Sequence, residues 1–159
     1  MARLCSAGVT LRNQINIAFP ARDRRSDGWI GDAKHQARRS DHNPDAHGVV
    51  YALDIDENMG RGRERNGATA MRLADELIAY AASGLPGAKR VKYVVYEDRI
   101  ASGTYRKTWW RWRGKGYGHT GHIHISFTPA ADKDGGLFPL PILARDEVVR
   151  KAWSEALGL

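Results

Sequence analysis

The chain between residues 118 and 127 reads Gly118-His119-Thr120-Gly121-His122-Ile123-His124-Ile125-Ser126-Phe127. Its last six residues alternate between polar and apolar side chains, and successive side chains of a β-strand point to opposite faces. His122 and His124 would then share one face, and the three apolar residues would anchor the other face in the core. A solvent-facing histidine pair without a chemical role would alternate in the same way. The clustering of three histidines favours a chemical site on the polar face.

A second alternating stretch, from Val49 to Asp56, follows a loop rich in turn-forming residues between Ser40 and Gly48. One face would carry Val49, Tyr51, Leu53 and Ile55, and the other Val50, Ala52, Asp54 and Asp56. Both carboxylates would therefore point the same way. This arrangement would present Asp54 to a cleft.

The remaining periodic segments predict helices over Thr10–Phe19, Asn66–Ala82 and Arg145–Leu157, and strands over Val91–Glu97 and Tyr105–Arg113. The helix over Asn66–Ala82 would turn Met71, Ala74, Leu77, Ile78 and Ala81 toward the core. We expect a small α+β domain with a central, largely antiparallel sheet flanked by helices. Residues 1–143 would form that domain, and residues 144–159 a helical tail that docks on it or leads into a further module.

Bulk composition restricts the class of protein. A chain of 159 residues fits one domain with one genuine core. The net charge of +7 favours an anionic partner, such as nucleic acid, an anionic cell wall or a membrane surface. No apolar run approaches the roughly 18 residues that span a bilayer, so we expect no membrane span. The single cysteine, Cys5, cannot form an internal disulfide, and the N-terminus lacks the apolar region of a signal peptide.

The histidines and Asp54 together suggest a metal site. A catalytic zinc ion needs about three nitrogen or oxygen ligands and an open position, usually supplied by separate elements. The strand with His122 and His124, the Ser40-x-His42 loop and the strand with Asp54 offer such a set.

Three motifs also carry a resemblance to a known family: Ser40-x-His42, Ala52-x-Asp54 and His119-x-x-His122-x-His124. They resemble the signature of the zinc peptidoglycan peptidases that include D-alanyl-D-alanine carboxypeptidases, L-alanyl-D-glutamate endopeptidases and the penicillin-insensitive murein endopeptidase. The phage endolysin members are the most similar, through residues 31–44 and 52–55, and the likeness spans Leu11 to Phe127. It implies that His42, Asp54 and His124 bind Zn²⁺, that His122 lies beside the metal, and that His119 borders the site.

The chain departs from the family pattern in the spacing of its first ligand. The commonest pattern places the first histidine seven positions before the aspartate, whereas His42 precedes Asp54 by twelve. His47 does stand seven positions before Asp54 and remains the alternative ligand. We prefer His42 because it alone follows the Ser-x-His part of the motif.

A second departure concerns proton transfer. Many relatives carry a carboxylate three residues before the last zinc histidine, but this position is Gly121. The murein endopeptidase pattern instead has a histidine nearby, and His122 is therefore the candidate proton-transfer group, with His119 as its alternative. Arg39, or its neighbour Arg38, would steady an oxyanion or a substrate carboxylate, unless the two only form a solvated basic loop. The run from Trp109 to Arg113 would either cover the sheet or contact substrate.

The expected function is zinc-dependent hydrolysis of a peptide bond in the peptidoglycan stem peptide or cross-link, as in a phage endolysin. We expect peptidoglycan and an anionic cell-wall polymer as partners, no nucleic acid, and a monomer. The protein would stay in the host cytoplasm until a membrane lesion releases it to the cell wall. The alternative is a basic metal-dependent nuclease or nucleic-acid-binding protein, because basic charge with interleaved aromatic residues is typical of single-strand binding. A non-catalytic wall-binding module would leave the histidine cluster unexplained.

Overall fold

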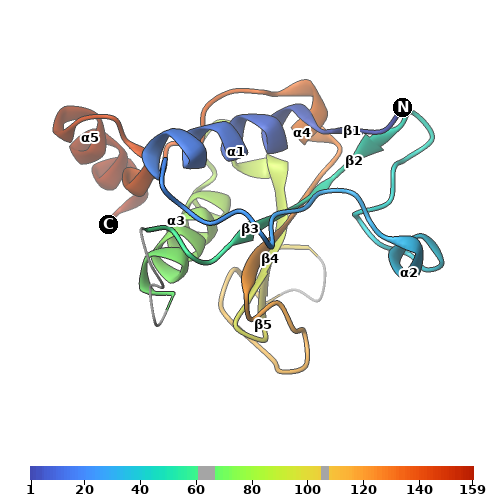
Figure 1. The fold of residues 1–159 in the computed structure, drawn as a ribbon. Helices are drawn as coiled ribbons and strands as arrows, with labels where there is room; N and C mark the ends of the chain where they lie inside the picture. The colour runs from blue at the N-terminus through green and yellow to red at the C-terminus, as the bar shows by residue number, and fades with distance from the viewer. Residues whose placement is uncertain (61–66, 105–107) are drawn as a thin grey trace.

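A four-stranded antiparallel sheet organises the computed structural model, which describes residues 1–60, 67–104 and 108–159 (Figure 1). Its strand order is β3-β6-β4-β5, so the last strand in sequence, β6, lies between β3 and β4. The strands of this sheet are β3 (Ala52–Asp56), β4 (Val91–Tyr96), β5 (Arg99–Ser102) and β6 (His122–Phe127). The fold is α+β with a largely antiparallel sheet, which confirms the predicted fold class.

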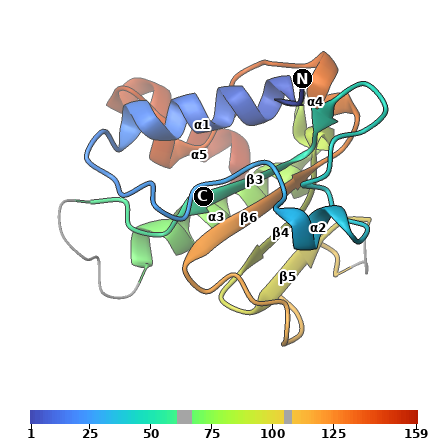
Figure 2. The same cartoon turned by 45° about the vertical axis from the view of Figure 1, so that its right-hand side comes forward.

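The other elements surround this sheet. A short parallel pair joins β1 (Arg3–Leu4) to β2 (Val49–Val50). The α-helices are α1 (Ser6–Ala18), α2 (Ala33–Gln36), α3 (Ala68–Ser83), α4 (Ala130–Lys133) and α5 (Glu147–Leu157), and the 3₁₀ turns are η1 (Ala88–Arg90) and η2 (Pro141–Leu143). In Figure 2, α3 lies behind β3 and β6, while α2 lies on the near side of the sheet. Within the described ranges, no helix is both long and apolar enough to cross a lipid bilayer.

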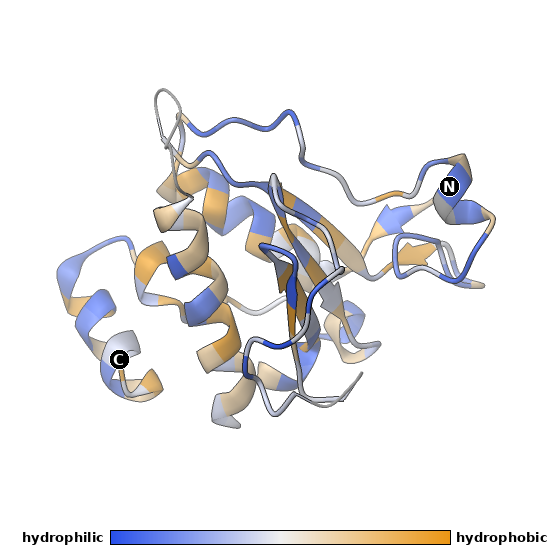
Figure 3. Cartoon of the chain, turned by 90° about the horizontal axis from the view of Figure 1, so that it is seen from below, coloured by the Kyte–Doolittle hydropathy of each residue, from blue (hydrophilic) through white to orange (hydrophobic). Residues whose placement is uncertain are grey.

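The hydrophobic core lies between one face of the sheet and the helices α1 and α3. Ile123, Ile125 and Phe127 of β6 are buried there, as their alternation predicted. Leu11 of α1 and Leu77 of α3 belong to the same cluster of buried side chains. Figure 3 shows the same division along the chain, with hydrophobic residues on the strands and adjoining helix faces and mostly hydrophilic residues in the long loops. The opposite face of the sheet is therefore left for polar side chains.

The predicted strand from Val49 to Asp56 divides at Tyr51. Residues 49–50 pair with the N-terminal strand, whereas residues 52–56 pair with β6, so the chain changes sheets between them. The predicted faces hold for β3: Leu53 and Ile55 are fully buried in the core, and Asp54 lies on the other side.

The helices agree with their predicted positions except at the ends. The first begins at Ser6 instead of Thr10, because Cys5, Ala7 and Leu11 extend its buried stripe toward the N-terminus. The helix α3 ends at Gly84, which adopts the left-handed conformation that glycine permits (φ +71°). Asn66, the predicted start of that helix, lies outside the described residues.

The predicted strand over Tyr105–Arg113 is wrong where the structure describes it, because residues 108–112 form no strand. Trp109 and Trp110 have φ angles of +55° and +58°, in the left-handed region that a strand excludes. Only Arg113 makes an isolated bridge, to Ile100. Residues 105–107 lie outside the described ranges.

β4 pairs with β6 on one side and with β5 on the other, and the sequence did not predict β5. A two-residue turn joins β4 to β5, and Glu97 and Asp98 both have positive φ angles, +49° and +64°. Such turns suit the twist of a hairpin and usually contain Asn or Gly. This turn lacks both residue types, so the usual hairpin signal is missing.

The C-terminal tail forms the predicted helix. Asp146 caps its N-terminus, since one carboxylate oxygen accepts a hydrogen bond from the backbone N–H of Val149 at 2.9 Å. All residues of α5 are described and none is fully buried. The helix therefore lies on the surface of the molecule, beside η2.

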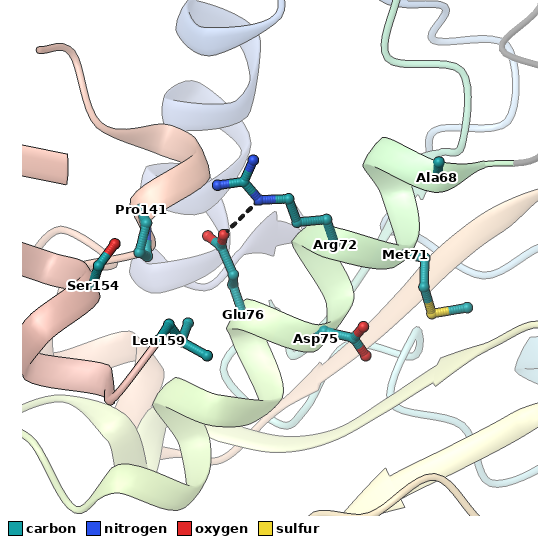
Figure 4. Close-up of a pocket in the computed structure, with 8 residues that line it drawn as sticks. All are labelled: Ala68, Met71, Arg72, Asp75, Glu76, Pro141, Ser154 and Leu159. Atoms are coloured by element: carbon teal, nitrogen blue, oxygen red, sulfur yellow. Dashed lines mark hydrogen bonds and ion pairs between the residues drawn. The ribbon is translucent and has the colours of Figure 1, made fainter. Parts of the chain in front are cut away.

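Glu76 joins α3 to the segment that leads into this tail. Its carboxylate accepts hydrogen bonds from the Arg72 side chain at 2.9 Å and from the backbone N–H of Ile142 at 2.7 Å. Figure 4 shows Arg72 and Glu76 at a pocket of about 450 Å³ that Pro141 and Leu159 also line. The hydrogen bond from Ile142 to the buried Glu76 thus links η2 to α3.

Glu76→Ala is expected to lower the free energy of unfolding by about 2 kcal/mol, because it leaves the partly buried N–H of Ile142 without its charged acceptor. Urea denaturation followed by circular dichroism measures the change. Glu147→Ala is the matched control, since the Glu147 side chain is 79% exposed and pairs only with the exposed Arg150. Equal effects of the two substitutions would show that Glu76 does not fasten the segment.

Candidate metal centre

The polar face of the sheet brings the predicted histidines and carboxylates together. In the register of β3 and β6, Asp54 stands opposite His124, and Asp56 stands opposite His122. Directly opposed residues of an antiparallel pair point to the same face. The alternation predicted for both strands is therefore confirmed at these four positions.

His42 reaches this face from the loop that precedes β2. Its backbone N–H donates to the Ser40 hydroxyl at 3.2 Å, and its carbonyl accepts from Gly31 at 3.0 Å. The ring Nδ1 lies 3.0 Å from the backbone carbonyl oxygen of Trp29. Because a carbonyl only accepts hydrogen bonds, Nδ1 carries the proton and donates. This contact turns the Nε2 atom of His42 toward the strands.

Three candidate ligand residues converge at this point. His42 Nε2 lies 3.1 Å from His124 Nδ1 and 3.3 Å from Asp54 Oδ2. His124 Nδ1 lies 2.9 Å from Asp54 Oδ1. Two imidazoles and one carboxylate from three separate segments are therefore close enough to hold one metal ion.

The His124 ring is fixed from its other side. Its Nε2 atom lies 2.9 Å from the hydroxyl of Ser126, the next residue on the same strand face. A hydroxyl can donate or accept, so Ser126 suits either tautomer of the ring. Tyr93 stacks on the imidazole at a centroid distance of 5.6 Å. Outer contacts of this kind orient metal-binding histidines.

Electrostatics favour the metal-binding forms of Asp54 and His124. Burial raises the pKa of Asp54, but hydrogen bonds from His124 and His42 outweigh it and hold that pKa well below its ordinary value. Burial lowers the pKa of His124 despite the neighbouring carboxylate. Burial also opposes protonation of His42, yet the hydrogen bond and charge of Asp54 leave its pKa raised. An ionised Asp54 and a neutral His124 are the states that a metal requires.

His119 and His122 form a second group around the same aspartate. His119 Nδ1 lies 2.6 Å from His122 Nε2, which lies 3.7 Å from Asp54 Oδ2. Together with Asp54 they also could hold a metal ion. Burial, followed by the charge of His124, lowers the pKa of His119 to about 4, so its imidazole is neutral at neutral pH.

The loop that carries His119 is held from the β4–β5 hairpin. The Asp98 carboxylate accepts hydrogen bonds from the backbone N–H groups of Gly116 and Gly118 at 2.9 and 2.8 Å. The N–H of Glu97 donates to the carbonyl of His119 at 3.2 Å. His119 itself has a φ of +56°, which is uncommon for a residue other than glycine. These contacts hold its ring beside His122 and His124.

A pocket of about 310 Å³ opens over the first group, and His42, His119 and His124 line it. Arg38 and Arg39 lie at its border and are exposed, so the basic loop faces the space where a ligand would bind. The pocket in Figure 4 has a different character, because the Glu76 carboxylate there is already paired within the protein.

Two expected features lie away from the cluster. The His47 side chain is exposed and belongs to neither metal-binding group of the described residues. The tryptophans do not line the pocket over the cluster. Trp112 donates a hydrogen bond from Nε1 to Asp75 of α3 at 2.8 Å, and Trp110 packs on the core. Only Trp109 is largely exposed, at 74%.

Comparisons with family models, with curated proteins and with solved structures find no match to this chain. Function is therefore inferred from the arrangement of the site and from the motifs quoted above.

Proposed function

We propose that this chain is a zinc peptidase that hydrolyses a peptide bond in the stem peptide or cross-link of peptidoglycan. The observation that carries the proposal is the convergence of His42, Asp54 and His124 beside a pocket bordered by arginines. Each imidazole of the set also has an orienting partner, the Trp29 carbonyl or the Ser126 hydroxyl.

The ligand chemistry supports zinc over the other common divalent ions. Two imidazole nitrogens and a carboxylate suit zinc, whereas magnesium and calcium prefer oxygen ligands alone. On a tetrahedral zinc ion with ligand bonds of about 2.0–2.1 Å, neighbouring ligand atoms lie roughly 3.3 Å apart. The separations among the three candidate residues, 2.9 Å to Asp54 Oδ1, 3.1 Å between the imidazoles and 3.3 Å to Asp54 Oδ2, are close to that value. Three protein ligands are also the usual number in catalytic zinc sites.

The side chains around these ligands have separate proposed roles in proton transfer and in substrate binding. When bound, zinc supplies Lewis acidity that polarises the scissile carbonyl and lets water attack near neutral pH. His122 is the candidate proton-transfer group, since its side chain is 26% exposed beside Asp54. His119 orients His122 through the 2.6 Å contact between their rings. Arg39, with Arg38, would hold a substrate carboxylate or the developing oxyanion at the pocket border.

The substrate class follows from the quoted motifs and from charge. The motifs resemble those of peptidoglycan peptidases, and the stem peptide of peptidoglycan carries carboxylates that would be attracted to a chain of net charge +7. The likeness is greatest to phage endolysins, and we propose that role, with an anionic wall polymer as a further partner. We propose cleavage at L-alanyl-D-glutamate or at D-alanyl-D-alanine, the bonds cut by the peptidases that the motifs resemble.

Zymography on purified peptidoglycan tests this function. The zinc-loaded protein is expected to clear the substrate, to lose that activity with a zinc chelator, and to regain it with added Zn²⁺. Mass spectrometry of the released fragments would show new peptide termini and identify the bond. Plasmid and single-stranded DNA serve as parallel substrates. Absence of clearing by the zinc-loaded protein would contradict the proposal. Cleavage of DNA in place of peptidoglycan would favour the nuclease.

A further inference from the structure

We propose that the centre can take a second metal ion, bound by Asp54, His119 and His122 beside the first. This inference deepens the proposed function, because the two ions would share Asp54. The second group has the same composition as the first, two imidazoles and a carboxylate, and one ligand atom of each residue lies within 4.8 Å of the others.

The Asp54 carboxylate lies within reach of both groups. Its Oδ1 atom lies 2.9 Å from the Nδ1 atom of His124, in the first group. Its Oδ2 atom lies between the groups, 3.3 Å from the Nε2 atom of His42 and 3.7 Å from the Nε2 atom of His122. Centres with two metals commonly hold the ions about 3.5–4 Å apart, a distance that a single carboxylate can bridge. The strand register that opposes Asp54 to His124 and Asp56 to His122 thus places the two groups side by side.

His119 and His122 are held in a fixed arrangement for this second site. Their rings stand at an interplanar angle of 83° with the two nitrogens 2.6 Å apart. The hairpin contacts of Glu97 and Asp98 fix the backbone on which His119 depends. Little chain movement is needed to bring both nitrogens to one ion, since binding it replaces only the hydrogen bond between the rings.

The ligand types and the charges around the second site indicate which metal ions it would bind and how tightly. Nitrogen ligands select zinc or cobalt over magnesium and calcium. The side chain of His122 is 26% exposed, so an ion can enter from solvent. Arg38 and Arg39 add positive charge to the neighbouring pocket. Repulsion between two cations about 4 Å apart should make the second ion bind at least about tenfold more weakly than the first.

Occupation of the second site would have a functional consequence. An ion bound to His122 would make its imidazole a metal ligand and so remove the group proposed for proton transfer. Excess zinc should therefore inhibit the peptidase, although stoichiometric zinc activates it.

Zinc titration of the metal-free full chain by isothermal calorimetry, with elemental analysis after equilibrium dialysis, tests the second site. The wild type is expected to bind one ion tightly and a second ion at least about tenfold more weakly. His119→Asn and His122→Gln should each keep the first ion and lose the second. Asparagine is chosen because it tolerates the positive φ of position 119. Mg²⁺ is the comparison ion and should not occupy the site.

The outcomes separate this inference from the proposed function. A wild type that takes up only one ion, or either variant binding the second ion with unchanged affinity, would overturn the second site. His42→Ala reports on the first site alone, and full retention of tight binding there would count against the proposed zinc peptidase. His47→Ala should match the wild type and controls for adventitious binding by an exposed histidine. Circular dichroism confirms that each variant is folded.

Discussion

His42→Ala is expected to abolish tight zinc binding and peptidase activity, whereas His47→Ala keeps both. His42 Nε2 points to Asp54 and His124, whereas His47 belongs to neither metal-binding group of the described residues. Loss of an outer partner of a metal ligand already costs about 10–100-fold in affinity, so loss of the ligand itself should cost more. Elemental analysis after gel filtration, together with the rate of peptidoglycan hydrolysis, measures both effects.

The two histidine variants form a matched pair, because each removes one imidazole from the same loop. His47 is exposed, so its replacement should leave the thermal unfolding midpoint unchanged. If His47→Ala released the metal and His42→Ala retained it, the seven-residue spacing to Asp54 would be the correct guide to the ligand. The observed arrangement of the loop would then not be that of the metal-bound protein.

The second large effect is expected at His122. His122→Ala should keep the fold and the tight ion yet lower kcat by roughly 10²-fold or more, the usual contribution of a general acid or base. His122 belongs to the second group of residues and not to the first, so the tight ligands stay intact. Gly121 offers no carboxylate for proton transfer, which leaves the reaction dependent on a neighbouring imidazole. The measurement is kcat on a defined stem peptide at one zinc ion per chain.

His119→Asn is the comparison for His122→Ala, because it removes the neighbouring imidazole while suiting the backbone of that position. If His122 transfers the proton and His119 orients it, His122→Ala should have the larger effect on kcat. Near wild-type activity of His122→Ala would refute its role and transfer the proton-transfer step to His119. Loss of the tight ion from His122→Ala would instead make it a ligand of that ion.

Strand alternation is the part of the site that could be predicted from the sequence. The period of two in residues 122–127 and 52–56 fixes which side chains are buried and which share the polar face. It therefore placed Asp54, His122 and His124 on one side of the sheet, as the register confirms. The sequence motif, and not the spacing to Asp54, selected His42 over His47 for the group.

Contacts that do not depend on a side-chain pattern could not be predicted. The Nδ1 atom of His42 is oriented by the backbone carbonyl of Trp29, and every residue has a carbonyl. Ser126 could have been found, because it lies two positions after His124 and so shares its face. The positive φ of His119 has no local signal either, since contacts with the hairpin at Glu97 and Asp98 hold its loop.

The tryptophan segment shows how tertiary contacts can override a local pattern. Its alternating aromatic and basic residues favour a strand. The backbone N–H groups of Thr108 and Trp110 both donate to the carbonyl of Ser102 instead, which closes a turn at the end of β5. Because β5 already pairs with β4, the described part of this segment supplies only the bridge at Arg113 to the far edge of β5.

The position of β6 in the sheet has a consequence for the order of events during synthesis. The ribosome makes β3 and β4 well before β6, yet β6 lies between them. Neither earlier strand can pair with β6 until residues 122–127 have left the exit tunnel, although β4 can already form its hairpin with β5. Pairings between strands distant in sequence form slowly. Asp54 and His42 meet His124 only at that stage. A nascent chain therefore lacks the complete candidate metal centre until β6 is in place.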